Sequence, residues 1–263
     1  MRQDRLYVLW CRAMNETQTG ATAPYPETAD IETSSDAYAT RFSGPAGEWM
    51  LAVQERLTIR MLENRPGITI LDVGGGHGQL AVPLCRRGYR VTVLGSAESC
   101  RKRIAAVLDE GSCVFVRGNM IQLPFPDHSF DAVICFRLLT HCQAWPDLIR
   151  ELCRVSRGTV IVDYPTSQGI NAFAPALFNA KKKMEGNTRH WRLFVHEEVR
   201  TEFARHGYRE ARRAPQFFLP MVLHRMLRCR PFSAGLEACC RLLGLTRRWG
   251  SPVIVEMRRP LNH

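Results

Sequence analysis

The stretch ILDVGGGHGQL, residues 70–80, decides how this chain folds. The apolar run 68–73 predicts a β-strand with Asp72 near its end, and 79–86 predicts a helix after the glycines. Glycine permits a sharp turn and lets a ligand approach the backbone without meeting a Cβ atom. The free N–H groups at the start of a helix favour an electron-rich group, and open α/β sheets bind ligands at the carboxyl ends of their strands. We therefore expect a site for a nucleotide-type cofactor here.

The glycine spacing fits two kinds of cofactor. The pattern Gly76-x-Gly78-x-x-Ala81 is a variant of the dinucleotide fingerprint and would imply NAD or FAD. The pattern Asp72-x-Gly74-x-Gly76-x-Gly78 resembles instead the first motif of class I S-adenosylmethionine-dependent methyltransferases. The loop alone does not choose between the two.

A second block separates these alternatives. Residues 116–135 read VRGNMIQLPFPDHSFDAVIC. They resemble the methyltransferase block in which a strand end gives Gly-Asp, followed by Leu-Pro-Phe, Ser-Phe-Asp and a fourth strand. A dinucleotide dehydrogenase has no reason to carry this block. The resemblance covers roughly residues 38–163 and is closest to small-molecule methyltransferases of the ubiquinone- and menaquinone-biosynthesis type.

The alternation of strands and helices indicates an α/β fold with a mostly parallel sheet. The resemblance adds a Rossmann-like seven-stranded class I methyltransferase sheet with an antiparallel last strand, an N-terminal helical lid and an insertion after strand five. It implies three parts. These are an N-terminal segment and lid (1–45), an S-adenosylmethionine-binding core (46–165), and a basic acceptor-binding part that carries the C-terminal helices and last sheet strands (166–263).

Hydrophobic periodicity and turn residues give the expected boundaries of the elements. Strands are expected at 68–73, 90–94, 113–116, 130–135, 159–163 and 252–257. Helices are expected at 47–64, 77–87, 97–108, 145–155, 195–206, 219–230 and 234–243. Ser96 is the expected N-cap of the third helix. Residues 15–37, rich in Thr, Ser, Ala and Pro, are expected to form a linker.

The resemblance implies which residues touch the cofactor. The glycine-loop backbone would lie against the methionyl and ribose part of S-adenosyl-L-methionine, and Asp72 would accept hydrogen bonds from the ammonium side. Asn119 stands where the family has an acid that reads adenine; its oxygen can accept from the exocyclic amine, or Asn119 is a turn residue. Phe136 and Arg137 would flank the methionyl group, or be core and surface residues. The expected cofactor-binding residues are Asp72, Gly74, Gly75, Gly76, Gly78, Gly95, Ser96, Asn119, Met120, Phe136 and Arg137.

One position departs from the family pattern. The family has an acid at the end of strand two that holds the ribose hydroxyls, and Gly95 stands there in this chain. Ser96 or Glu98 would have to substitute, although Glu98 can equally complement the helix N-terminus. The same gap counts against NAD, whose ribose needs a similar acid. It keeps open a non-catalytic scaffold as an alternative function.

Methyl transfer is an in-line displacement, so alignment of the reacting atoms supplies most of the catalysis. A phenol, hydroxyl or acidic carbon would also need a base. His141, after strand four, and Tyr164, at the end of strand five, are the candidate catalytic residues; His141 can equally pack or cap the next helix. His190 and His224, in the distal region, are further candidates, although such histidines are more often ordinary surface residues.

Two further groups of residues are expected around the acceptor. Tyr38, Arg41 and Phe42 resemble the lid segment of relatives, and the alternative is a hydrophobic anchor for the first helix. Trp191, Arg189, Arg192 and Phe217 are the expected acceptor pocket, although such aromatics can also be core. An apolar cavity with a few cations suits a hydrophobic or aromatic small-molecule acceptor that carries an acidic group.

Charge is distributed unevenly along the chain. Residues 1–160 hold 18 Lys and Arg against 17 Asp and Glu, whereas 161–263 hold 18 against 8. A basic half indicates an acidic partner or a solvated face. RNA is an alternative acceptor, but no nucleic-acid-binding module is recognisable. A lipid or quinone at the membrane surface is another, because Leu219–Arg228 is basic and apolar. The sequence is silent on oligomeric state.

The ten cysteines are scattered and include no C-x-x-C pair. Buried reduced thiols in a cytoplasmic protein are therefore expected, and metal ligation is not. No signal peptide or membrane-spanning run is recognisable. The expected cofactor is S-adenosyl-L-methionine, with S-adenosyl-L-homocysteine as its product.

Overall fold

A computed structural model describes residues 25–169 and 191–260 of the chain. It contains a seven-stranded sheet in the order β3-β2-β1-β4-β5-β7-β6. Strands β1 to β5 are parallel and β7 is antiparallel to both of its neighbours. The predicted seven-stranded sheet, mostly parallel with an antiparallel last strand, is therefore confirmed. The strands are β1 Thr69–Val73, β2 Arg90–Gly95, β3 Cys113–Arg117, β4 Phe130–Cys135, β5 Ser156–Tyr164, β6 Arg209–Pro215 and β7 Val253–Arg258.

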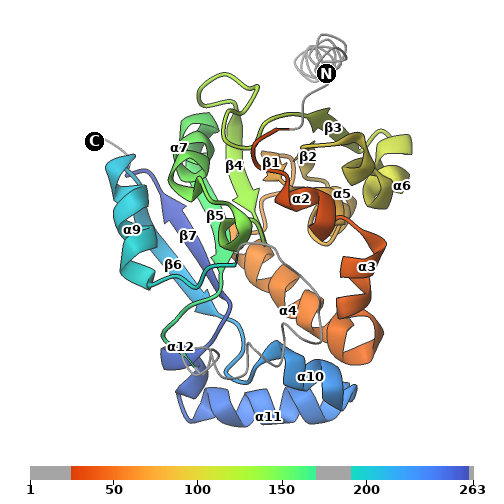
Figure 1. Cartoon of the computed structure of the whole chain (residues 1–263), viewed down its shortest axis with the longest axis vertical. Coiled ribbons are helices and arrows are strands. Elements are labelled where there is room, and N and C mark those ends of the chain that lie inside the picture. The colour runs from red at the N-terminus through yellow and green to blue at the C-terminus, as the bar shows by residue number, and fades with distance from the viewer. Residues whose placement is uncertain (1–24, 170–190, 261–263) are drawn as a thin grey trace.

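Helices cover both faces of this sheet (Figure 1). In β1 the alternation of side chains sends Ile70 to one face and Leu71 to the other, and each joins a separate core cluster. The cluster around Leu71 includes side chains of α7 and α9, and the cluster around Ile70 includes those of α5 and α6. The helices are α2 Ala29–Thr33, α3 Asp36–Ala39, α4 Gly44–Met61, α5 Ala81–Arg86, α6 Ala105–Asp109, α7 Trp145–Val155, α9 His196–Arg205, α10 Met221–Leu227, α11 Arg230–Leu242 and α12 Leu245–Trp249.

Short 3₁₀ helices shape the loops at the carboxyl edge of the sheet. They are η1 Thr40–Phe42, η2 Gly75–His77, η3 Glu98–Ile104 and η4 Leu139–His141. Strands β1 and β4 are neighbours in the sheet although two strands separate them in the chain, so their loops leave in opposite directions. That divergence opens the crevice in which α/β sheets bind ligands. The glycine loop and η4 border this crevice.

Three sequence predictions need correction. The linker expected at 15–37 contains α2 and α3, so it is wrong over those residues. The helix expected at 97–108 is mostly the 3₁₀ helix η3, and Ser96 does not cap it because its hydroxyl donates to Asp30. The resemblance implied a seventh strand, but no residues were assigned to β6, because its charged sequence is that of an exposed edge strand. Among the described residues no helix is long and apolar enough to cross a membrane.

Candidate cofactor and acceptor site

The glycine loop has the geometry that only glycine adopts without strain. Gly74 and Gly78 both have φ of +74°. A Cβ atom on Gly75 would lie 2.1 Å from the Asp72 carboxyl group, so the loop can fold back over that acid only with glycine at this position. The loop therefore passes directly over the carboxyl group at the end of β1.

Asp72 is a buried acid without a partner. The residue is completely buried, and neither carboxylate oxygen has a hydrogen-bond partner within the described structure. Removal from water disfavours the charge, and burial raises the pKa of Asp72 to about 7. An unsatisfied buried acceptor is costly, so its presence indicates a role outside the fold itself. A cationic group above the loop, such as an ammonium, would satisfy it.

His77 closes the glycine loop in its neutral form. Its Nδ1 accepts the backbone N–H of Gln79 at 3.1 Å, and the ring is buried. Burial lowers the pKa of His77 well below the usual value, and the positive charges of Arg137 and Arg103 add to that effect. The ring is therefore an uncharged cap for the loop. The sequence alone predicts no role for this side chain.

Residues 27–36, which we call the strap, cross the carboxyl edge of the sheet and are anchored by acids. Glu27 Oε1 accepts the backbone N–H groups of Gln143 (2.8 Å) and Ala144 (3.0 Å), beyond β4. At the other end, Asp36 forms ion pairs with Lys102 and Arg103 on η3, beyond β2. The strap thus spans the loops of β4, β1 and β2, where the sequence had predicted only a linker.

Asp30, in the middle of the strap, brings a carboxylate to the end of β2. It is fully buried; its Oδ2 accepts the Ser96 N–H at 2.6 Å, and its Oδ1 accepts the Ser96 hydroxyl. No acid could replace Gly95 itself, because a Cβ there would lie 2.8 Å from the Cβ of Cys100 and 2.9 Å from the Phe115 ring. A carboxylate therefore does lie at the end of β2, but it comes from another element and is bonded to Ser96. Glu98, the alternative considered from the sequence, is exposed and pairs with Arg101.

The expected adenine-side residues follow β3. Asn119 Oδ1 accepts the backbone N–H of Ile121 at 3.1 Å, which is the turn role considered as an alternative for it. Met120 is buried in the core cluster that also contains Leu94 and Leu138. Both residues follow β3, as the sequence predicts. The Asn119 side-chain oxygen already stabilises the turn through its hydrogen bond with Ile121.

Arg137 joins the loop after β4 to the predicted lid. It has a φ of +63°, its N–H donates to Asp163 Oδ1, and its guanidinium donates to Gln54 Oε1 at 2.9 Å. The guanidinium lies 4.2 Å from the centre of the Phe42 ring and 5.9 Å from that of Tyr38. Tyr38 also carries the guanidinium of Arg41 over its ring. The structure thus brings the three lid residues together with Arg137. Phe136, by contrast, is wholly buried in the core.

Asp163, at the end of β5, was not among the predicted site residues. Burial raises the pKa of Asp163 to about 6, although the Arg137 N–H, the Arg137 charge and Gln54 oppose that shift. Its two oxygens accept from the Arg137 backbone and the Gln54 amide. Asp163 therefore fixes the strained backbone of the β4 loop in place.

The two candidate bases lie in different surroundings. His141 ends η4 and is half-buried at the carboxyl edge. Tyr164 is buried, and its hydroxyl forms a hydrogen bond with His196 Nδ1, whose Nε2 lies 2.6 Å from Glu210. Burial raises the pKa of Tyr164, so the phenol keeps its proton at neutral pH. His224, expected at the surface, is instead fully buried and hydrogen-bonded to Glu237, so that expectation was wrong.

The predicted acceptor residues do not form one pocket. Arg189 lies outside the described residues. Arg192 pairs with Glu198, and its backbone exchanges hydrogen bonds with Thr140 of η4, which keeps the 191–194 segment beside the β4 loop. Trp191 is half-buried at the start of that segment. Phe217 is a core residue packed against Trp49, so its assignment to a pocket is corrected.

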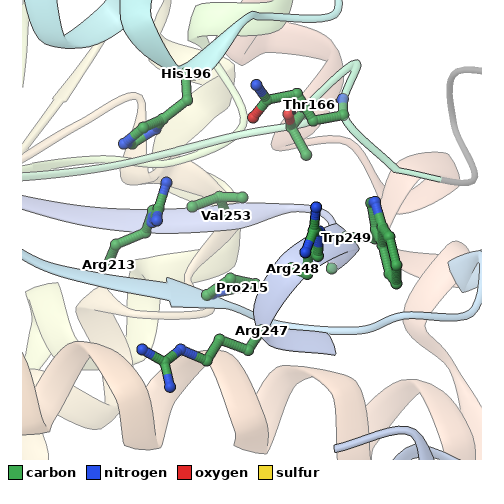
Figure 2. A pocket seen from close by; sticks show the side chains of 10 residues that line it. Thr166, His196, Arg213, Pro215, Arg247, Arg248, Trp249 and Val253 are labelled. Carbon is green, nitrogen blue, oxygen red and sulfur yellow. Dashed lines mark hydrogen bonds between the residues drawn. The ribbon is translucent and has the colours of Figure 1, made fainter. Parts of the chain in front are cut away.

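A cavity of about 360 Å³ does open at the carboxyl ends of β5 and β6. Its lining includes Arg213, Arg247 and Arg248 but no acidic residue. Figure 2 shows Arg213 pointing toward His196 from one side and Arg248 beside Trp249 on the other, with Arg247 directed away. The volume is that of a small-molecule site. No sequence motif predicts this cavity, because its arginines come from separate segments of the sequence.

Comparison with known proteins places these residues in a family. Residues 71–162 match the methyltransferase domain family. The chain is 33% identical over 150 residues to the malonyl-[acyl-carrier protein] O-methyltransferase of Serratia marcescens, covering 52% of this chain and 55% of that protein. It is 32% identical over 138 residues to the demethylmenaquinone methyltransferase of Porphyromonas gingivalis, covering 46% and 56%. The chain thus spans little more than half the length of these relatives.

A solved structure shares the fold across most of the chain. Magnesium protoporphyrin IX methyltransferase from Synechocystis, crystallised with S-adenosylhomocysteine, superposes with a TM-score of 0.59 at 15% identity. The match covers 88% of this chain and all of that one. At such identity the likeness concerns the fold. The family match concerns residues 71–162, and the solved structure shows that the chain shares the fold of that methyltransferase.

Proposed function

We propose that the protein transfers a methyl group from S-adenosyl-L-methionine to a small, hydrophobic acceptor that carries an acidic group. One observation carries the cofactor assignment. The carboxylate of Asp72 is buried, without a partner, directly beneath the glycine loop of a methyltransferase domain. The ammonium of the methionyl group supplies the charge that this acid lacks.

The residues around the crevice suit this cofactor. When bound, it supplies an electron-poor methyl group on a sulfonium. Asp72 accepts from its ammonium end, the loop 74–78 offers glycine backbone for close approach, and Asn119 and Met120 border the adenine side. Tyr38 and Phe42, which already pack around Arg137, exclude water from the reacting centre.

The strap controls access to this crevice. Asp30 accepts the N–H and hydroxyl of Ser96, which are the donors that the end of β2 would offer to the ribosyl part of a ligand. Ser34 covers the glycine loop, since its Oγ lies 2.6 Å from where a Cβ of Gly76 would be. We infer that the strap shifts when the cofactor enters and that Asp30 then gives up at least part of its bonding to Ser96.

The arginine-lined cavity is our reason for proposing that the acceptor carries an acidic group. It lies at the same edge as the crevice, one to three strands beyond β4, and adjacent strands are about 4.8 Å apart. An acceptor that reaches both places would carry its carboxylate or phosphate roughly 5–15 Å from the methylated atom. The names of the relatives, a quinone-pathway and a malonyl-carrier methyltransferase, fit an elongated acceptor of this kind.

His141 is the base we propose for an acceptor that must lose a proton. It ends the loop after β4 and lies next to Thr140, which holds the 191–194 segment. Tyr164 is less suited, because its raised pKa keeps the phenol protonated and its hydroxyl is committed to His196. An amine or thiol acceptor would need no base.

Thermal unfolding with alternative ligands tests the cofactor assignment. S-adenosylhomocysteine at 100 times its Kd should stabilise the protein by about 2.7 kcal/mol and raise Tm by several degrees. NAD at the same concentration should leave Tm unchanged. A shift with NAD and none with S-adenosylhomocysteine or S-adenosylmethionine would reject the proposal.

The acceptor cavity has its own test. The double variant Arg213→Gln/Arg248→Gln should weaken the binding of malonate, an acidic probe, about tenfold and leave S-adenosylhomocysteine binding unchanged, because each lost contact is a charge-assisted hydrogen bond. Arg56→Gln on the exposed side of α4 is the matched control. Unaltered malonate binding in the double variant would remove the cavity from the proposed acceptor site.

A further inference from the structure

Helix α11 buries polar side chains and exposes apolar ones, which is the reverse of an ordinary surface helix. Ser233 and Glu237, four residues apart, are 0% and 1% exposed and face the protein. Phe232 and Leu242 are 54% and 88% exposed. At 3.6 residues per turn, positions 232, 235, 239 and 242 share one side of the helix, and all four are exposed and uncharged. A surface helix normally turns its apolar stripe to the core and its polar side to water.

The neighbouring helices also carry exposed apolar side chains. Val222 and Met226 on α10 are 44% and 75% exposed, and Leu243 beyond α11 is 74% exposed. Figure 1 shows α10, α11 and α12 together at the lower end of the molecule, with α11 outermost. Clustered exposed apolar side chains mark an interaction site. We define the α10–α12 face by its exposed large apolar side chains, Val222, Met226, Phe232, Leu242, Leu243 and Trp249.

Charge on this face selects the kind of partner. Residues 219–250 contain six arginines and one acid, Glu237. That acid is buried and accepts from the backbone N–H groups of Phe218 and Leu219 and interacts with His224, so its charge is not presented outward. Arg228 and Arg230 are exposed. The face therefore presents apolar side chains beside the exposed arginines Arg228 and Arg230.

We propose that the α10–α12 face docks the protein on the surface of an anionic lipid bilayer. Phe232, Leu242 and Leu243 enter the headgroup region, and the flanking arginines contact lipid phosphates. A second copy of this chain fits the face less well, because a self-complementary contact would bring arginine against arginine. Docking does not depend on methyl transfer. It leaves the arginine-lined cavity, to which α12 contributes Arg248, beside the docked face.

Vesicle co-sedimentation tests this assignment. The full chain should bind vesicles of mixed phosphatidylcholine and phosphatidylglycerol, bind phosphatidylcholine alone much more weakly, and be released by salt. The variant Phe232→Gln/Leu242→Gln should remain in the supernatant with an unchanged Tm, because both side chains are exposed. Val195→Gln, which replaces a 46% exposed apolar side chain away from the face, should bind like the unmodified protein.

A charge variant gives a graded result. Each interfacial cation is worth about 1 kcal/mol, or roughly fivefold in partitioning, so Arg228→Gln/Arg230→Gln should lower the partition coefficient roughly twenty-five-fold. Arg56→Gln should leave it unchanged. Recovery of the unmodified protein in the supernatant with mixed vesicles at low salt would overturn the proposal. So would a dimer, seen by light scattering, that Phe232→Gln/Leu242→Gln dissociates, since the face would then serve self-association.

Discussion

The two halves of the sheet's carboxyl edge differ, because the strap covers one half and the other half opens into a cavity. Over β2, β1 and β4 the strap lies across the loops, and its acids Glu27, Asp30 and Asp36 bond donors of the chain itself. Over β5, β7 and β6 the edge opens into a cavity lined by arginines, beside the basic α10–α12 face. At the first end the acids of the strap are bonded within the chain; at the second Arg213 pairs with Glu210, while Arg247 and Arg248 line a cavity whose lining includes no acid. We infer that cofactor entry requires rearrangement, whereas the acidic group of an acceptor meets a prepared site.

The largest expected effect is at the closed end. Gly76→Val should abolish S-adenosylhomocysteine binding in calorimetry, because a Cβ at Gly76 would lie 2.3 Å from the Cys100 carbonyl oxygen and 2.6 Å from Ser34 Oγ. Gly235→Ala, where no atom lies within 4 Å of the new Cβ, is the control. Circular dichroism would verify that each variant folds. Normal binding by folded Gly76→Val would mean that the loop does not hold the ligand.

A pH dependence is expected from the buried acid of the same end. The raised pKa of Asp72, about 7, means that the carboxyl is mostly protonated at pH 6 and mostly ionised at pH 8. An ammonium favours the ionised form, so the Kd of S-adenosylhomocysteine should fall about tenfold from pH 6 to pH 8. Asp72→Asn should bind weakly and without this pH dependence, whereas the exposed Asp109→Asn should retain it. Tighter binding at pH 6 would contradict the role given to Asp72.

The smallest expected effect concerns the strap. Asp30→Asn replaces a charge-assisted acceptor of the Ser96 N–H by a neutral one, a loss of about 1 kcal/mol. If the strap competes with the cofactor, S-adenosylhomocysteine should bind roughly fivefold more tightly and associate faster in stopped-flow measurements. Asp36→Asn, at the exposed outer end of the strap, should change both less. Weaker binding by Asp30→Asn would mean that this carboxylate holds the ligand instead of excluding it.

The sheet was predictable because its strands carry unusually clear signals. A parallel strand that is buried on both faces has a mostly apolar sequence, as in β1 and β4. Turn residues flank it on both sides. The edge strand β6 carries no such run, since four of its seven residues are charged. The linker prediction at the strap failed because polar composition says nothing of tertiary contacts made by Glu27 and Asp30.

The candidate site, like the fold, has parts that the sequence predicts and parts that it does not. Residues in motifs, such as Asp72, Gly76 and Arg137, lie at or just after the ends of β1 and β4, the sheet positions that the sequence predicts for them. The carboxylate beside Gly95 comes from Asp30, 66 residues earlier than Ser96, and no spacing rule connects the two. The cavity arginines are likewise joined only by the fold. The sequence therefore predicts the part of the candidate site that lies in one loop. The parts that combine several elements become visible only in the tertiary structure.

A crystal structure with S-adenosylhomocysteine is the most direct test of the cofactor crevice. The ligand is expected over residues 74–78, with its ammonium bonded to Asp72 directly or through one water, and with the bond between Asp30 and the Ser96 N–H broken. Ligand bound elsewhere, while Asp72 stays buried without a partner and Asp30 remains on Ser96, would contradict the proposed function.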